Sequence, residues 1–206
     1  MEIFKVNLRI RDCMDKEWMI ANGKGSYAMQ TVSGTNTRSY HGLLVASQNE
    51  PLDRNVILSN ILEDVYINGE EFKLYTVMNE DYISPGYKNL YSFKYDFCPE
   101  FIYKLNTKND EIFITKKLQM VRGKNVVVLK YTIEAKSDEI YMDFLPLLNY
   151  RNFHGVNSNL DLSQMKLEKD KVKFNITNTN NYFNEKKPRS VELYMKVFDS
   201  EYISLN

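Results

Sequence analysis

The sequence predicts an all-β protein, a large antiparallel β-sandwich with little helix. Apolar residues recur at every second position in many short segments, and turn-forming residues separate these segments at short intervals. The 206 residues include 15 Tyr and 11 Phe but a single Trp, and Tyr and Phe suit the half-buried face of a sheet. Because helical periodicity is scarce, an antiparallel sandwich is the favoured architecture.

Strands are expected along the whole chain. Residues 4–10 alternate between apolar and polar, and residues 191–197 repeat this alternation near the other end. Between them, strands are expected at 18–21, 25–33, 43–46, 56–62, 101–105, 112–118, 125–134, 140–145 and 171–176. The run Val126–Leu129 is apolar at four successive positions, which is typical of a central strand covered on both faces.

The connections between the strands are also predicted. Asn68-Gly69 supplies the two positive φ angles of a type I′ hairpin, which would join Val65–Ile67 to Phe72–Leu74. The best helical spacing lies at Leu160–Leu167 and predicts a turn or two of helix. Long loops are expected at 79–89 and 153–159, and an exposed loop or hairpin at 175–187.

Charge and cysteine content exclude several classes of protein. The 27 Lys and Arg balance the 27 Asp and Glu, and without a basic cluster a nucleic-acid partner is not expected. No apolar run is long enough to span a membrane or to serve as a signal peptide. Cys13 and Cys98 have no metal-ligand spacing and indicate a cytoplasmic protein, although a disulfide between them stays open.

The segment Gly23–Ala28 matches the G-x-G-x-x-A form of a dinucleotide-binding fingerprint. That chemistry needs a helix to begin there, with its N-terminus directed at a pyrophosphate. The residues that follow, Met29–Val32, are strand-like instead. A glycine-rich bend, with Gly23 and Gly25 at positive φ, is therefore the favoured interpretation.

Two clusters contain both histidines of the chain. Arg38, Tyr40 and His41 precede the apolar segment 43–46, and Arg151 and His154 follow a second apolar segment. An Arg fork and a Tyr ring suit a sugar, through hydrogen bonds to hydroxyls and stacking on the ring face. The residues alone favour the alternative, a network that pins a loop or fills a domain interface.

Other catalytic arrangements are not supported. Two histidines without ordered carboxylate or Cys spacing make no convincing metal site, and no G-x-S-x-G nucleophile elbow is present. The adjacent acids Glu63-Asp64 and Glu80-Asp81 would point to opposite faces of a strand, so neither pair suits glycosidic acid/base chemistry. Both pairs are expected to be solvated.

Two stretches resemble the start of the N-terminal domain of prokaryotic-type glycogen debranching enzymes. Residues 17–28 read EWMIANGKGSYA, and residues 31–46 read TVSGTNTRSYHGLLVA. The family pattern is E-W-L-x-T-N-G-x-G-G-Y-A followed by T-V-S-G-x-N-T-R-x-Y-H-G-L-L-V-A. Weaker similarity continues through 58–63, the Asn68-Gly69 hairpin and 146–154. The departures are Ala21, Lys24 and Ser26, of which Ser26 replaces the second glycine of the adjacent G-G pair.

The resemblance implies a β-sandwich of the supersandwich type that precedes an (α/α)6-barrel with α-1,6-glucosidase (amylo-α-1,6-glucosidase) activity. We therefore expect residues 1–206 to be one non-catalytic N-terminal domain, cut from a longer polypeptide whose barrel carries the catalytic carboxylates. Its expected role in glycogen degradation is to pack on the barrel and to contribute to binding of the α-glucan. The alternative is a purely structural interface module without sugar contact.

The expected contact surface, toward barrel or glucan, contains seven residues: Trp18, Tyr27, Arg38, Tyr40, His41, Arg151 and His154. The arginines would donate hydrogen bonds, while Trp18, Tyr27 and Tyr40 would supply packing or stacking. No catalytic residue, metal or cofactor is expected in this chain. The expected partners are the catalytic barrel of the same polypeptide and an α-glucan, with no nucleic acid and no membrane.

Overall fold

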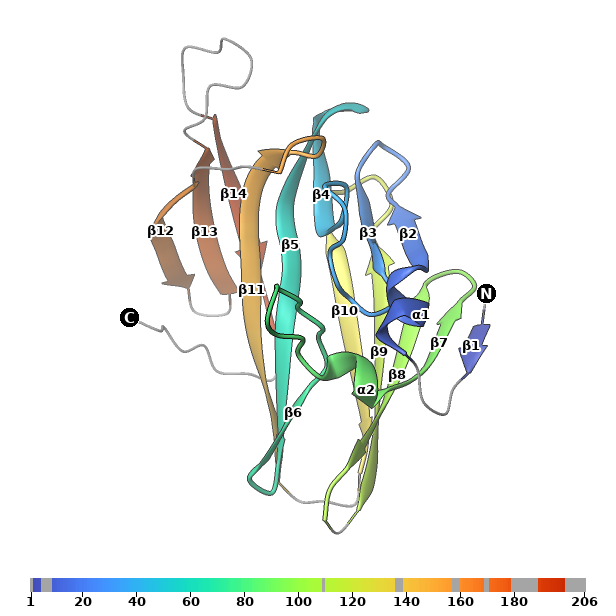
Figure 1. The fold of residues 1–206 in the computed structure, drawn as a ribbon. Coiled ribbons are helices and arrows are strands. Elements are labelled where there is room, and N and C mark those ends of the chain that lie inside the picture. Colours follow the sequence, from blue (N-terminus) through green and yellow to red (C-terminus); the bar gives the residue numbers. More distant parts are fainter. Residues whose placement is uncertain are drawn as a thin grey trace.

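Two large antiparallel sheets face each other, and a smaller third sheet lies at their flank (Figure 1). The computed structural model describes residues 2–4, 9–108, 110–135, 139–156, 160–168, 171–178 and 189–198. Strands dominate this part of the chain, and its only two helices are short. The predicted all-β sandwich is therefore confirmed.

The six-stranded sheet is built around one long strand, β5 (Leu52–Ile67), which pairs with three neighbours. Its spatial order is β11-β5-β4-β3-β2, and β6 also pairs with β5. The other strands are β2 (Glu17–Ala21), β3 (Tyr27–Thr31), β4 (Gly42–Asn49), β6 (Glu70–Lys73) and β11 (Ile140–Asn152). Asn68 and Gly69 adopt φ angles of 49° and 82° between β5 and β6, which confirms the predicted hairpin.

The five-stranded sheet has the spatial order β1-β7-β8-β9-β10. Its members are β1 (Glu2–Phe4), β7 (Leu90–Tyr95), β8 (Pro99–Asn106), β9 (Glu111–Met120) and β10 (Val127–Glu134). In β8 and β9, alternate residues are buried and partly exposed. One face of this sheet therefore packs inward, and the other is free.

The third sheet consists of β12 (Leu160–Glu168), β13 (Lys171–Asn178) and β14 (Arg189–Met195). It lies against the six-stranded sheet through contacts between β13 and β11. Ile176 of β13 and Leu193 of β14 are buried in the common core. An ion pair between Arg189 and Asp53, 2.8 Å long, joins β14 to the start of β5.

Two short helices complete the described structure. Helix α1 (Ile10–Met14) buries Cys13, and helix α2 (Gly86–Asn89) packs against β6, β7 and β8. Cys13 and Cys98 are both free thiols, so the disulfide that the sequence left open is not formed. Neither helix is long and apolar enough to cross a membrane.

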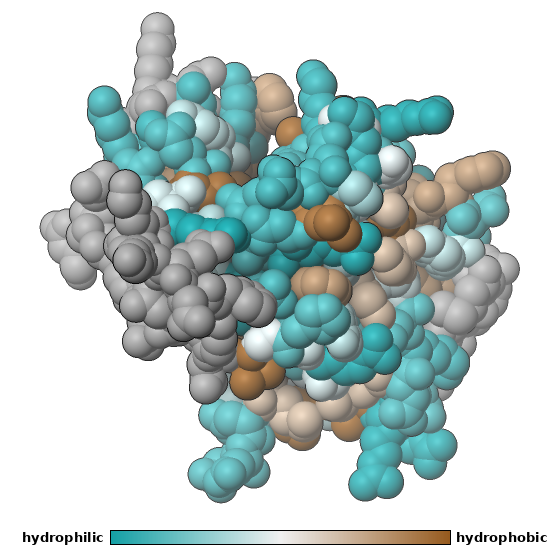
Figure 2. All heavy atoms as spheres, turned by 90° about the horizontal axis from the view of Figure 1, so that it is seen from above, coloured by the Kyte–Doolittle hydropathy of each residue, from teal (hydrophilic) through white to brown (hydrophobic). Residues whose placement is uncertain are grey.

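Most of the buried apolar side chains belong to one core between the two large sheets. Trp18 of β2 packs edge-on against Phe101 of β8, with ring centroids 6.1 Å apart, and Tyr131 of β10 packs 5.3 Å from Phe144 of β11. Seen from above (Figure 2), hydrophobic residues reach the surface only in small separate patches among hydrophilic ones. The inner faces of both sheets are thus used for packing.

Three predicted elements differ from the structure. Ile10 begins α1 instead of ending a strand, because burial of Cys13 stabilises a helical turn there; residues 5–8 lie outside the described residues. Val127–Leu129 belong to β10, an edge strand, and Val126 precedes it; Val126 and Val128 are 42% and 46% exposed. An apolar run does not specify where a strand lies in its sheet.

The segment at 160–167 is a strand, not a short helix. It pairs with β13 in antiparallel register, Leu167 lying opposite Val172, and this non-local pairing outweighs a weak helical spacing. The expected loop at 79–89 contains α2 and a β-bridge between Met78 and Ile83. In the loop expected at 175–187, the first four residues belong to β13 and residues 179–188 lie outside the described residues.

A charged group lies inside the core, where the sequence predicted a solvated acid. Glu63 of β5 is fully buried and forms an ion pair with Lys116 of β9 on the opposite sheet. The Tyr131 hydroxyl donates a hydrogen bond of 2.6 Å to the same Glu63 oxygen. The second oxygen, Oε2, has no partner among the described residues, so only one side of this carboxylate is compensated.

Removing one member of this pair is expected to destabilise the fold strongly. Glu63→Gln or Lys116→Met would leave one buried charge unpaired, which costs about 3–5 kcal/mol of the free energy of unfolding. The double variant Glu63→Met/Lys116→Met removes both charges and is expected to lose less than either single variant. Urea unfolding monitored by circular dichroism measures each loss.

The neighbouring pair Lys117–Glu100 is a matched control, because both side chains remain partly exposed on the outer face. Its disruption by Lys117→Met is expected to lower the free energy of unfolding far less than either single variant of the buried pair, because solvent screens exposed charges. Additive losses in the Glu63/Lys116 double variant would contradict this account of the core.

Candidate functional site

The glycine-rich bend between β2 and β3 has a structural role: it reverses the chain between two paired strands. Gly23 and Gly25 have φ angles of 80° and 99°, as predicted, and the chain continues as β3 without a helix. A Cβ atom on Gly25 would lie 2.7 Å from the Pro51 carbonyl oxygen. Since no helix N-terminus faces this bend, it lacks the anion-binding geometry of a dinucleotide site.

Ser26 does not need the conformation of the glycine that it replaces, because its φ is not positive. Its hydroxyl donates a 2.5 Å hydrogen bond to the Asn125 side chain and accepts one of 2.7 Å from the Ser47 backbone N–H. Asn22 also donates to the Lys124 carbonyl, at 3.1 Å. The bend therefore ties β2, β3 and β4 to the β9–β10 connection on the facing sheet.

His41 lies at the end of the connection between β3 and β4 and is completely buried. Its Nδ1 accepts a hydrogen bond of 3.0 Å from the Thr37 backbone N–H. Nε2 must then carry the proton of the neutral ring, and it donates to Glu17 Oε1 at 3.0 Å. Burial lowers the pKa of His41, while the Glu17 carboxylate opposes that shift. Through these two hydrogen bonds, the buried His41 ring fixes the conformation of the β3–β4 loop.

Arg38 lies at the exposed edge of the same loop. Its Nε is 3.3 Å from Glu17 Oε1, so a single carboxylate holds both Arg38 and His41. The guanidinium carbon lies 5.6 Å from the centre of the Tyr40 ring, within the range of a cation–π contact. About half of the Arg38 side chain (51%) remains exposed, which leaves donors available to a ligand.

Arg151 connects the two predicted clusters. Its Nη1 donates hydrogen bonds of 2.8 Å to the Ser39 carbonyl and 2.6 Å to the Gly155 carbonyl. One guanidinium group thus fixes the β3–β4 loop to the turn that follows β11. The side chain is 8% exposed, and this burial lowers the pKa of Arg151.

Tyr40 and His154 meet at the surface above this junction. The Tyr40 hydroxyl lies 3.0 Å from His154 Nδ1, and Phe153 packs 5.4 Å from the Tyr40 ring and 4.0 Å from the His154 ring. Arg54 places its guanidinium 5.6 Å from the Phe153 ring centre. We call Arg38, Arg54, Tyr40, Phe153 and His154 the Tyr40 cluster.

Tyr27 supports this cluster from below. It is 5% exposed and packs with Val45 and Val56 in a small second core, which Phe153 partly covers. Its hydroxyl donates a hydrogen bond of 3.0 Å to the Tyr40 carbonyl. Burial raises the pKa of Tyr27 to about 12, although the nearby Arg54 and Arg151 charges oppose the shift.

The structure brings together six of the seven predicted residues. Arg38, Tyr40 and His154 present exposed atoms, while Tyr27, His41 and Arg151 hold them in position. Trp18 lies apart in the main core, 2% exposed against Phe101, so its ring offers no surface to a partner. Phe153 and Arg54 were not predicted; Phe153 adjoins the predicted His154 in sequence, but Arg54 has no local signal.

The Tyr40 cluster has the chemistry of a binding surface. It offers guanidinium and imidazole nitrogens beside two aromatic rings, and Glu17 is the carboxylate that pairs with it. Among the described residues, no three His, Cys, Asp or Glu side chains gather closely enough to hold a metal ion. Hydrogen-bond donors beside apolar ring faces suit a polyhydroxylated ligand.

The comparison with protein families gives a clear result. The family model described as glycogen debranching enzyme N terminal matches residues 16–204. Because this match covers most of the chain, the protein belongs to that family. Neither the curated proteins nor the solved structures contain a match.

Burial of His41 should make the stability of the fold depend on pH. The pKa of this group is lowered by folding, so the unfolded chain binds its proton more readily. The free energy of unfolding is then expected to fall as the pH drops below about 6.5, the ordinary His value. In His41→Asn this decline should be weaker, as measured by urea unfolding between about pH 7.5 and pH 5.

His154→Asn provides the control, because it removes the other histidine of the chain at an exposed position. A decline that flattens equally in both variants would argue against His41 as its source.

Proposed function

We propose that this chain is the non-catalytic N-terminal β-sandwich of a cytoplasmic glycogen debranching enzyme, an amylo-α-1,6-glucosidase. It packs on the catalytic barrel of the same polypeptide and contributes a surface to α-glucan binding. The family match supports the enzyme class. The observation that carries the glucan contact is the Tyr40 cluster, whose exposed groups converge from two segments more than a hundred residues apart.

Three features of this cluster favour a sugar. The Arg38 guanidinium has exposed donors, the Tyr40 and Phe153 rings offer apolar faces, and the His154 ring adds a polar atom. The supporting residues Arg151 and Tyr27 are buried and hydrogen-bonded, so the surface is organised before a ligand arrives. Such preorganisation reduces the entropic cost of binding.

Packing on the barrel is supported by an exposed apolar stripe on β11. Tyr141, Leu145 and Leu147 are 52%, 49% and 37% exposed. The intervening Met142 and Phe144 pack on the core, so the three exposed apolar residues point to the opposite face of the strand. The exposed Asp143 lies on the same face, between Tyr141 and Leu145. Apolar side chains aligned on one sheet face are typical of a surface that a protein partner covers.

Maltoheptaose is expected to bind the Tyr40 cluster with millimolar affinity. In ¹H–¹⁵N NMR spectra, backbone amide signals of residues 38–41 and 152–155 should shift on titration. Arg38→Ala or Tyr40→Ala should weaken binding roughly tenfold, equivalent to about 1.4 kcal/mol, while Tyr141→Ala should not. Trp18 fluorescence is a poor reporter, because the ring is buried in the core.

Unmoved signals in both segments at millimolar sugar would contradict glucan contact at this cluster and favour the purely structural module. Release of glucose from a branched dextrin by this chain would contradict its non-catalytic assignment.

The apolar stripe predicts the surface that the barrel covers. Leu145→Asp and Leu147→Asp are expected to weaken association with the separately produced catalytic part of the polypeptide at least tenfold, measured by co-purification and calorimetry. Both side chains are outward-facing, so far-ultraviolet circular dichroism should remain unchanged. Val128→Asp, at an exposed outer position of β10, is the matched control, and an equal loss in that variant would refute the assignment.

A further inference from the structure

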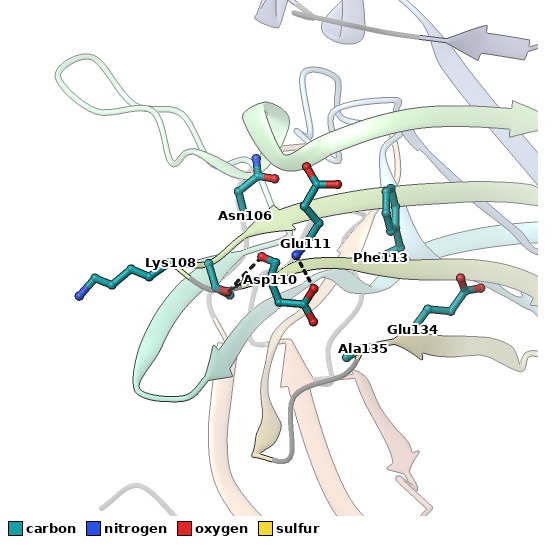
Figure 3. Close-up of a pocket in the computed structure, with 8 residues that line it drawn as sticks. Asn106, Lys108, Asp110, Glu111, Phe113, Glu134 and Ala135 are labelled. Carbon is teal, nitrogen blue, oxygen red and sulfur yellow. Dashed lines mark hydrogen bonds between the residues drawn. The ribbon is translucent and has the colours of Figure 1, made fainter.

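A second hollow lies on the five-stranded sheet, apart from the Tyr40 cluster. It has a volume of about 780 Å³ and is lined by the ends of β8, β9 and β10 and the β8–β9 turn. Figure 3 shows Asn106, Glu111, Phe113 and Glu134 projecting to the same side of these strands, whereas Asp110 turns the other way. The hollow is thus framed by four convergent side chains.

Strand register explains this convergence. Phe113 of β9 lies between Lys104 of β8 and Glu134 of β10, and Asn106 lies opposite Glu111. The residues that alternate with them are buried in the core, for example Leu105 and Ile112 at 0% exposure. Successive side chains on a strand point to opposite faces, so this set lies on the outer face of the sheet.

Phe113, the aromatic residue that lines the hollow, is held by neighbours on the same sheet face. Tyr91 of β7 packs edge-on against Phe113, with centroids 5.8 Å apart at 81°, and Tyr91 is 42% exposed. Lys104 sits 5.9 Å from the Phe113 ring centre and forms a 2.6 Å ion pair with Glu111. These contacts hold the Phe113 ring in place on an otherwise solvated sheet face.

Polar groups at the rim are available to a ligand. Within the described part of the chain, the side-chain amide of Asn106 and the carboxylate of Glu134 make no hydrogen bond or ion pair. Thr107 and Asp110, on either side of residue 109, exchange backbone and side-chain hydrogen bonds of 2.9–3.0 Å. Among the described residues, the rim therefore offers one side-chain amide and one carboxylate without a partner, beside the bonded pair Thr107 and Asp110.

We infer that this outer-face hollow is a second sugar-binding site, in which a glucose unit of an α-glucan packs on Phe113. Its hydroxyl groups donate to the Glu134 carboxylate and exchange hydrogen bonds with the Asn106 amide. Apolar ring faces flanked by a few polar groups are the usual composition of such pockets. The choice of an α-glucan as ligand rests on the proposed function, whereas the sugar chemistry rests on these side chains.

The experiment is a titration of the chain with maltoheptaose, read from backbone amide NMR signals at both surfaces. Signals of residues 104–108, 110–113 and 132–135 are expected to shift. Phe113→Ala and Glu134→Gln should weaken these shifts at least fivefold. Glu134 is exposed, so its variant keeps the fold even if Phe113→Ala does not. The matched control Gln119→Ala, at an exposed position farther along β9, should leave the shifts around Phe113 unchanged. Tyr40→Ala should also leave the shifts around Phe113 unchanged, although it weakens binding at the Tyr40 cluster.

Two results would overturn the inference: unmoved signals around Phe113 at saturating sugar, or shifts there that survive both Phe113→Ala and Glu134→Gln. Shifts confined to residues 38–41 and 152–155 would refute this second site while supporting glucan contact at the Tyr40 cluster. Shifts confined to the surroundings of Phe113 would support the second site and refute that contact.

Discussion

Burial of the two facing sheet surfaces is the constraint on which the rest of this structure depends. Most of β4 is buried on both faces, but β8, β9 and β11 each commit one set of alternate side chains to the core, as the buried Leu105 and Ile112 show. The other set is thereby directed outward. Two of the candidate binding surfaces follow from this division, because the Phe113 hollow and the apolar stripe on β11 consist of outward-facing residues.

Buried polar groups determine how the surface is shaped. Arg151 and His41 are almost inaccessible to solvent, yet they hold the β3–β4 loop against the turn after β11 and against Glu17. Desolvating such groups is costly unless hydrogen bonds compensate them. Below the Tyr40 cluster, hydrogen bonds of Arg151 and His41 offset the cost of burying them. These buried groups hold the exposed Arg38, Tyr40 and His154 in a fixed arrangement. Glu63 and Lys116 join the two sheets by a similar, only partly compensated interaction.

Local sequence patterns correctly predicted the features that depend on neighbouring residues, namely most strands and the β5–β6 hairpin. Period-two alternation located most strands, and Asn68-Gly69 specified a hairpin because positive φ angles are strongly residue-dependent. The same signals were insufficient for β10, whose apolar run did not reveal its edge position, and for β12, whose partner strand supplies the hydrogen bonds. The prediction that Glu63 is solvated was wrong. The alternation pattern of a strand does not show that Lys116 on the facing sheet would pair with this carboxylate in the core.

The sequence by itself determined the strand content, the glycine bend, the hairpin and six of the residues that gather around Tyr40. Only the tertiary structure decided which of these residues are exposed. Arg38 and His154 reach solvent, whereas His41 and Arg151 support them from within, and Trp18 belongs to the main core. The physical reason is that burial depends on residues distant in sequence, such as Phe101 over Trp18 or Ser39 beside Arg151. Such contacts exist only after the sheets have packed.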